Sequence, residues 1–453
     1  MTARSAAPLL AALSICAGAL FAFGTAQPIT SDGVAPADTS APASAWLALL
    51  PDGSIKRRFI LDCAGCHVLG ARITRVGGAS RSRESWEASV AQMLLFAGAT
   101  TSFPTTPPCL PIATRLKPQT GSRSTWSDQA PAPTSPAAEP AGFEVVEYPL
   151  PRPDLPHDVA IAADGRIIVT GMLTGVLYAL DPADGGFTEI SIPVPEANPR
   201  AIEVTPDGAW WVVLGGPAKI ARHDPRTGEW RHWNVGIYAH ETAIDSSGRV
   251  WYNGHFTKSP EILGVLDPAT GATRTFEVPS PPMENGGSTF PYGLRVGGDG
   301  TVWMTQLLGN RLVRFDPQTE SFTIYDLPTP HSGPRRLDVD SEGRVWIPEF
   351  PNDRLALFSP ETGTFIEHVF PTRDALPYVA RVDDRRGVVW LGTAAGDLVG
   401  RFDTATGEWV EIPLPTHAAL VRHLAIDPQT GDVWGAYAPF PIESPKVFVI
   451  KAR

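Results

Sequence analysis

The chain has 453 residues, of which 43% are hydrophobic and 19% charged, which is enough for one large domain and a smaller one. The 42 glycines and 46 prolines make the chain rich in turns, although their share stays below that of disordered chains. Lys and Arg number 37 and Asp and Glu number 48, a formal charge of −11. This charge argues against nucleic acid as a partner, because phosphate binding needs a basic surface. Four cysteines are too few for a disulfide-stabilised scaffold.

The N-terminus has the pattern of an export signal. Residues 6–23 are almost all apolar and are followed by the small residues 24–26, which suits cleavage before Gln27. We therefore expect residues 1–26 to be removed and the protein to be periplasmic or secreted. An uncleaved membrane anchor is the alternative, since 18 apolar residues are at the lower limit for spanning a bilayer. A lipid anchor at Cys16 fits poorly with the bulky residue before it. No other stretch is apolar enough to span, so we expect no stable membrane insertion after cleavage.

A haem-attachment motif follows in residues 63–67, which read Cys63-Ala64-Gly65-Cys66-His67. At this spacing two thiols can bind the vinyl groups of a haem while the histidine ligates the iron. A redox-active dithiol and half of a zinc site are the alternatives. No second cysteine pair follows, however, and no thioredoxin-like strand and helix surround the motif. The motif predicts a covalent haem c attached to Cys63 and Cys66, with His67 as an iron ligand.

The surroundings of this motif resemble class I cytochromes c over residues 52–100. Residues 55–61 can form the short helix that leads into the motif, and residues 83–93 resemble a helix of small bacterial cytochrome domains with Ser, Trp, Val and Met at fixed spacing. The resemblance implies that Met93 is the sixth ligand of the haem iron. The alternative is that Met93 is a core methionine, which is the commoner role of a methionine at helical spacing.

The haem segment is shorter than the cytochrome pattern. After Gly98 no closing helix is visible, and residues 101–142 are rich in Pro, Ser and Thr, which break helices and strands. We predict a truncated α-helical haem segment over residues 27–100 and an extended linker over residues 101–142. Cys109 lies in this linker, and no role for it follows from the sequence.

From residue 143 the chain is periodic. Turns of the type Asp-Pro-x-Thr-Gly recur at steps of 43 to 49 residues. A second set of turn glycines is followed, three residues later, by Trp in six repeats and by Ile in one. These glycines are Gly165, Gly208, Gly248, Gly300, Gly343, Gly387 and Gly431. Seven repeats of this length, each with four short strands, predict an all-β, seven-bladed β-propeller over residues 143–453.

The last repeat lacks an outer strand, and residues 143–149 have the pattern of one. We therefore expect this N-terminal strand to complete the seventh blade, which removes the exposed strand edges. The recurring Trp should fill the space between blades.

The repeats, such as residues 338–346, resemble those of the virginiamycin B lyase (streptogramin lyase) family. The resemblance covers residues 143–453 and implies the propeller fold. The resemblance predicts the function less specifically than the fold, because one propeller fold hosts many activities.

Ligands of propellers bind over the central channel, where the innermost strand of each blade begins. That start is expected eight residues before each turn glycine. The positions are polar or ionisable in six of seven blades: His157, Arg200, His240, Tyr292, Arg335, Val379 and His423. Three residues after the Trp column, the second strand ends at Gly171, Leu214, Gly254, Gln306, Glu349, Thr393 and Tyr437. We expect ligand contacts from Arg200, Tyr292, Gln306 and His423. The alternative is a solvated ring of loops that only satisfies backbone groups.

The family resemblance implies a lyase site in which a Glu-Pro-His step and a second Glu hold Mg²⁺ and a general base. Glu349 lies fourteen residues after Arg335, where the family has its second Glu, and is the candidate Mg²⁺ ligand. Gly333-Pro334-Arg335 replaces Glu-Pro-His, and an arginine stays protonated and cannot act as an ordinary base. His157 or His240 would have to act from another blade. The candidate catalytic residues are therefore His157, His240, Arg335 and Glu349.

Three functions are compatible with these patterns. In the first, the propeller binds a small anionic molecule, for which Arg200 and Arg335 are suited, and the haem exchanges electrons with that molecule or with a periplasmic redox partner. The second is a Mg²⁺-dependent lyase that opens a cyclic ester. The third is a non-enzymatic binding module. We expect a monomer, and docking of the haem segment on the propeller, because residues 27–142 carry a net charge of +2 and residues 143–453 carry −14.

Overall fold

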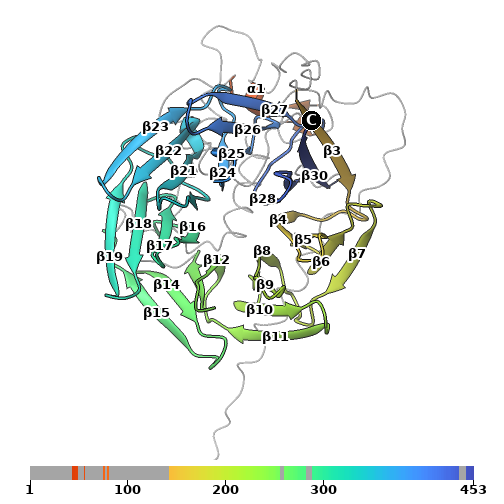
Figure 1. The fold of residues 1–453 in the computed structure, drawn as a ribbon, viewed down its shortest axis with the longest axis vertical. Helices are drawn as coiled ribbons and strands as arrows, with labels where there is room; N and C mark the ends of the chain where they lie inside the picture. The colour runs from red at the N-terminus through yellow and green to blue at the C-terminus, as the bar shows by residue number, and fades with distance from the viewer. Residues whose placement is uncertain are drawn as a thin grey trace, which may run out of the picture. The chain divides into compact units, whose positions relative to one another are not determined.

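The computed structural model describes residues 43–48, 56, 75–76, 79–80, 142–255, 260–281, 288–437 and 445–453. Seven four-stranded antiparallel sheets form the blades of a closed ring, with the first strand of each blade at the centre (Figure 1). The fold class predicted from the repeats is therefore confirmed. Before the ring, the described residues form helix α1 (Ala43–Leu47) and a hairpin of strands β1 (Arg75–Val76) and β2 (Ala79–Ser80). Among the described residues, no helix has the length and apolar character needed to cross a bilayer.

Each blade runs from an inner strand through two middle strands to an outer strand. The inner strands are β4 (Pro156–Ile161), β8 (Pro199–Val204), β12 (Ala239–Ile244), β16 (Pro291–Val296), β20 (Asp338–Val339), β24 (Pro377–Asp383) and β28 (Leu424–Ile426). The second strands are β5 (Ile167–Gly171), β9 (Trp210–Leu214), β13 (Val250–Gly254), β17 (Val302–Gln306), β21 (Val345–Glu349), β25 (Val388–Thr393) and β29 (Val433–Tyr437).

The third strands are β6 (Val176–Leu180), β10 (Lys219–Asp224), β14 (Glu261–Leu266), β18 (Arg311–Asp316), β22 (Arg354–Ser359), β26 (Leu398–Asp403) and β30 (Lys446–Ala452). The outer strands are β7 (Phe187–Ser191), β11 (Glu229–Asn234), β15 (Thr273–Val278), β19 (Ser321–Asp326), β23 (Thr364–Val369), β27 (Trp409–Pro413) and β3 (Phe143–Pro149). A short 3-10 helix, η3 (Phe350–Asn352), follows β21.

The ring closes as the sequence predicted. Strand β3 pairs antiparallel with β30, from Phe143 opposite Ala452 to Pro149 opposite Lys446, and so completes the blade of β28, β29 and β30 (Figure 1). The seven turn glycines all have positive φ, which a residue with a Cβ adopts at a cost. This explains why glycine recurs at the turn between the first and second strands.

The Trp column is buried between blades. The Trp251 ring lies 5.6 Å from that of Phe315 on the next blade, and the Trp303 ring lies 5.7 Å from that of Phe358. Each sheet thus buries its two faces against the neighbouring blades, as the fully buried second strands show.

A repeated polar contact also joins neighbouring blades. The Thr329 hydroxyl donates to Glu367 at 2.7 Å, the Thr372 backbone N–H donates to Glu411 at 2.9 Å, and the Thr416 hydroxyl donates to Glu147 at 3.0 Å. In each case the threonine follows one outer strand and the glutamate lies on the next. These contacts fix the loops that lead into the following inner strand.

Candidate functional site

The candidate site is the ring of residues at the start of the inner strands. In five blades this stretch contains a register shift, for example between Pro156 and Val159, where one extra residue interrupts the pairing with the second strand. Such bulges redirect side chains and occur next to active sites. Here they bring two consecutive side chains of one strand, such as those of His157 and Asp158, to the channel.

Side chains of the preceding blade hold the loops before these strands. Asn310, Asp353 and Asp397 have left-handed backbone conformations, with φ of 57°, 48° and 53°. Their side-chain oxygens accept backbone N–H groups of Ser332, Leu376 and Ala419, at 2.6, 3.0 and 2.9 Å. The residues fixed in this way, Ser332, Leu376 and Ala419, precede the ring residue of their blade by two or three positions.

The structure corrects the predicted ring in its last two blades. There the turn after the inner strand is one residue longer, as shown by the pairs Asp383 with Val388 and Asp427 with Asp432. Counting eight residues back from the glycine therefore gives Val379 and His423, whereas Tyr378 and Arg422 occupy the equivalent positions. The ring consists of His157, Arg200, His240, Tyr292, Arg335, Tyr378 and Arg422. His423 lies one position deeper in the channel.

The ring is buried, in contrast to the solvated loops considered above. His157, His240, Tyr292, Arg335 and Tyr378 are each at most 5% exposed, and only Arg200 among the predicted ring residues is half-buried. Charged groups at this depth interact strongly, because water does not screen them.

The first cluster of the ring centres on Asp158. Its carboxylate accepts His157 Nδ1–H and Arg336 Nη1–H, both at 2.7 Å, and lies 3.5 Å from His423 Nε2. Burial opposes ionisation of Asp158, but the Arg336 guanidinium holds its pKa below the usual range. Burial lowers the pKa of His157 to about 3. His157 is therefore a neutral imidazole whose Nδ1 hydrogen is directed to Asp158, which leaves the lone pair on Nε2.

A second cluster contains stacked imidazoles. The rings of His240 and His255 lie 4.2 Å apart, and each Nδ1 faces a backbone carbonyl oxygen, of Tyr292 at 3.2 Å and of Pro291 at 3.0 Å. Because a carbonyl oxygen can only accept, Nδ1 carries the hydrogen in both. Burial, then neighbouring imidazoles and arginines, lowers both pKa values well below the usual range.

The third cluster encloses Arg335. Its guanidinium carbon lies 3.8 Å from the centre of the Phe350 ring, 4.5 Å from Tyr378 and 5.0 Å from Tyr292. Nη1 donates to the Tyr292 hydroxyl at 2.9 Å, and that hydroxyl is hydrogen-bonded to Tyr378. Cation–π contacts on several sides stabilise the charge without a carboxylate.

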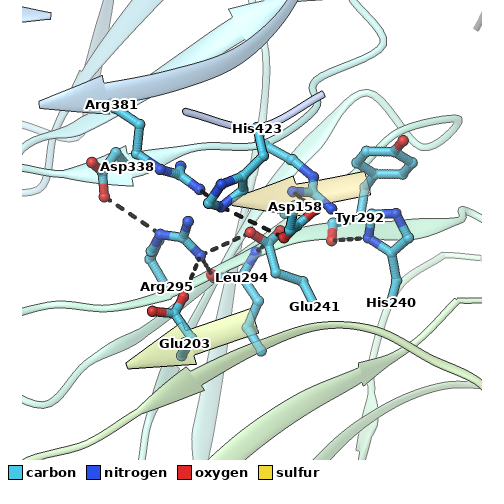
Figure 2. Close-up of polar contacts among 12 residues, drawn as sticks. Asp158, Glu203, His240, Glu241, Tyr292, Leu294, Arg295, Asp338, Arg381 and His423 are labelled. Carbon is cyan, nitrogen blue, oxygen red and sulfur yellow. Dashed lines mark hydrogen bonds and ion pairs between the residues drawn. The ribbon is translucent and has the colours of Figure 1, made fainter. Parts of the chain in front are cut away.

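Below the ring, a network of charged side chains fills the channel (Figure 2). Arg295 lies at its centre, 2.8 Å from Glu241, 3.5 Å from Asp338 and 3.7 Å from Glu203. These four residues come from four consecutive inner strands. The contacts join the blades at the axis of the propeller.

The network continues to Arg381, which donates to His423 Nε2 at 2.5 Å and to the Leu424 carbonyl at 3.1 Å. Burial, with Arg295 nearby, lowers the pKa of Arg381 to about 10. Sequence reasoning missed the deeper members of the network, which are Asp158, Glu203, Glu241, Arg295, Arg336, Asp338 and Arg381. The signal was present, since these charged residues fall one or three positions after the ring residues.

Glu349 and Gln306 lie at the ends of their second strands, where Glu349 pairs with Pro334 and Gln306 pairs with Pro291. The Gln306 amide donates to Ser280 at 2.5 Å. Glu349 is fully buried, and among the described residues neither of its carboxylate oxygens has a hydrogen-bond partner. Burial, then the neighbouring Glu367 carboxylate, raises its pKa to about 8.

The residues around Glu349 do not fit the Mg²⁺ site that the family resemblance implied. Glu367 is bonded to Thr329 and Arg354, and the cationic Arg335 stands where the family has a histidine. Within the described ranges, no group of three His, Cys, Asp or Glu side chains is arranged to hold a metal ion. We therefore assign Glu349 no metal.

Replacing Glu349 tests its burial. The native carboxyl keeps its proton up to a pH of about 8, whereas an unfolded glutamate releases it near 4.5, so native stability falls as the pH rises through this range. We expect Glu349→Gln to remove this fall. Relative to wild type, its unfolding free energy should be higher at pH 9 than at pH 5 by a few kcal/mol, at about 1.4 kcal/mol per pKa unit. Urea unfolding at both pH values measures it, with the exposed Glu361→Gln as control. Equal pH dependence in Glu349→Gln and wild type would contradict the assignment.

The predicted haem residues Cys63, Cys66, His67 and Met93 lie outside the described residues. Two described pieces of the same segment contact the propeller. In α1, Ala43 and Leu47 belong to one buried cluster with Tyr292, Phe350 and Tyr378, and the Ser44 N–H donates to the Ala395 carbonyl at 2.9 Å.

Lys56 forms the second contact. It makes a buried ion pair of 2.8 Å with Asp374, on the loop between β23 and β24. Asp353, which fixes this loop, has its pKa raised by burial to about 6. Both contacts lie at the end of the blades that carries the ring.

Fold and site together define a seven-bladed β-propeller with a polar, charged site on its axis. The sequence model of the virginiamycin B lyase family matches residues 185–437, more than half of the chain. The protein belongs to this family. Among curated proteins, none matches the chain.

Solved structures share the fold. A streptogramin B lyase aligns with a TM-score of 0.61 and 20% identity, over 69% of this chain and 98% of its own. The virginiamycin B lyase of Staphylococcus aureus aligns with a TM-score of 0.59 and 19% identity, over 69% of this chain and 100% of its own. The hydrazine synthase of Kuenenia stuttgartiensis aligns with a TM-score of 0.54 and 13% identity, over 66% of this chain and 96% of its own. At these identities the likeness establishes the fold alone.

Proposed function

We propose that this protein is an exported c-type haem protein, in which the propeller binds a small anionic ligand at the channel ring and a haem on the N-terminal segment exchanges electrons. When bound, haem c would supply one-electron redox chemistry through Cys63, Cys66, His67 and a sixth ligand for which Met93 is the candidate. The propeller would supply the ligand site and the surface against which the segment rests.

The observation that carries the proposal is the position of Lys56. Its ammonium group is fixed to Asp374, and Cys63 follows only seven residues later. A chain of seven residues spans at most about 25 Å. Attachment at Cys63 and Cys66 would therefore keep the haem near the end of blades 5 (β20–β23), 6 (β24–β27) and 7 (β28–β30 with β3) that carries Arg335 and Tyr378.

The ring supports the ligand half of the proposal. Arg200 and Arg335 have no carboxylate partner among the described residues. Arg200 donates to the amide oxygen of Asn198 and stacks on Tyr238. Arg335 lies among aromatic rings. A guanidinium left without a carboxylate is suited to an anionic group of a ligand.

The lyase reaction has less support in this chain. Arg335 cannot serve as the base, and the surroundings of Glu349 do not supply further metal ligands. The family includes solved enzymes, one of them an inactive variant with quinupristin, so we retain quinupristin as a control substrate.

Haem content is the decisive measurement. We expect one covalent haem per chain in the pyridine haemochrome spectrum of protein exported to the periplasm with a haem c maturation system. The Cys63→Ala/Cys66→Ala variant should have none, because both thioether bonds are lost. Cys109→Ala is the matched control and should keep the haem, since this cysteine lies outside the motif.

The other outcomes are equally informative. A chain without haem that opens quinupristin in the presence of Mg²⁺ would replace our proposal with the lyase. A chain that shows neither haem nor cleavage would leave a non-enzymatic binding module.

A further inference from the structure

Four buried N–H groups near the channel ring have no acceptor in the part of the chain that the structure describes. They are Arg335 Nε, Arg336 Nε, Arg422 Nη1 and His423 Nδ1, on residues that are at most 6% exposed. In His423, Nε2 accepts from Arg381, so the ring hydrogen lies on Nδ1. All four groups are donors, and they occupy two adjacent positions on blades 5 and 7.

The charges around these donors are not balanced. The ring and the layer beneath it hold four arginines, Arg200, Arg335, Arg336 and Arg422, against two carboxylates, Asp158 and Glu241. The imidazoles are neutral, because burial lowers their pKa values. Glu241 is already paired with Arg295. This positive centre lies inside a propeller that carries 26 Lys and Arg against 40 Asp and Glu.

Arg422 is the least satisfied of the four arginines. Among the described residues it makes no ion pair, and its Nη1 has no hydrogen-bond partner. A buried donor without an acceptor destabilises the folded protein, and a buried cation without a counter-charge does so more strongly. An anion within the channel would remove several of these penalties at once.

We propose that the channel ring between blades 5 and 7 binds one small oxyanion, a carboxylate or a tetrahedral inorganic anion, through Arg335, Arg336, Arg422 and His423. Guanidinium groups present paired N–H donors that match such oxygens. The inference specifies the ligand half of the proposed function and is independent of the haem. Gln306, which was expected from the sequence to contact the ligand, is not part of this anion site.

The test is anion binding to the full-length protein in a buffer of weakly coordinating anions. The melting temperature is recorded with phosphate, sulfate and oxalate at constant ionic strength, with chloride as reference, and affinities are measured by isothermal titration calorimetry. We expect a saturable rise for one of these oxyanions at one site per chain. Phosphate or sulfate would indicate an inorganic ligand, and oxalate alone a carboxylate of a metabolite.

The variants test which residues bind. Arg422→Gln should weaken the affinity at least tenfold while leaving the melting temperature of the anion-free protein unchanged or higher, because it removes an unpaired buried charge. Arg226→Gln, at an exposed arginine paired with Asp224, is the matched control and should bind normally. An equal affinity in Arg422→Gln and wild type would overturn the site.

If no oxyanion shifts the wild-type melting temperature beyond chloride, the inference is wrong and water satisfies these donors. Such a failure leaves the haem measurement untouched, since the titration contains no redox readout. A chain without haem would equally leave an observed anion site in place.

Discussion

Asp158→Asn is expected to lower the unfolding free energy by about 3–5 kcal/mol, because it leaves the fully buried Arg336 without a counter-charge. For a domain of this size the loss corresponds to a fall in melting temperature of roughly 10 °C. Calorimetry or circular dichroism at pH 7 measures it. Asn keeps the shape of the side chain, so the effect reports the charge.

Two further variants separate the charge from the packing. Asp164→Asn removes a carboxylate from an exposed ion pair with Arg166 and should change stability by less than about 1 kcal/mol. The double variant Asp158→Leu/Arg336→Met should recover most of the stability, because two apolar side chains need no partner. A loss of under 1 kcal/mol in Asp158→Asn would show that the ion pair does not hold the channel together.

Stability should also fall steeply below pH 6.5. Burial lowers the pKa values of His157, His240, His255 and His423, whereas unfolded histidines bind a proton near pH 6.5. Below that pH the unfolded chain therefore binds more protons than the native one, and acid favours unfolding. Each histidine contributes up to about 1.4 kcal/mol per pH unit, and all four together contribute up to about 5.5 kcal/mol per pH unit.

Urea unfolding between pH 7 and pH 5 tests this slope. His423→Gln should reduce the slope by about a quarter, and the exposed His232→Gln is the control for the substitution itself. A wild-type slope below that of a single buried histidine would mean that the four imidazoles take up protons in the folded protein. Because the stability contributed by Glu349 falls between about pH 4.5 and pH 8, the stability should be greatest near pH 7 and lower again at pH 8.

The propeller could be predicted from the sequence because its turns and its inter-blade packing repeat. A glycine is needed at each turn, and a large side chain is needed between each pair of blades, so both residues recur wherever the chain repeats. The closing strand followed from the same pattern, as residues 143–149 supplied what the last repeat lacked.

The site was predicted less well, for two physical reasons. Counting from a turn assumes a constant turn length, and one extra residue in the last two turns moved the prediction from Tyr378 to Val379 and from Arg422 to His423. The burial of the ring depends on loops and on α1, which approach it from distant parts of the sequence.

The closure of the ring has a consequence for the order of folding. Strand β3 is made before the other strands of the propeller, yet its partner β30 lies about 300 residues later. The pairing has a long loop to close, so it is a late and slow contact. Until then the chain upstream of Phe143 is tethered to an open arc rather than to a finished domain.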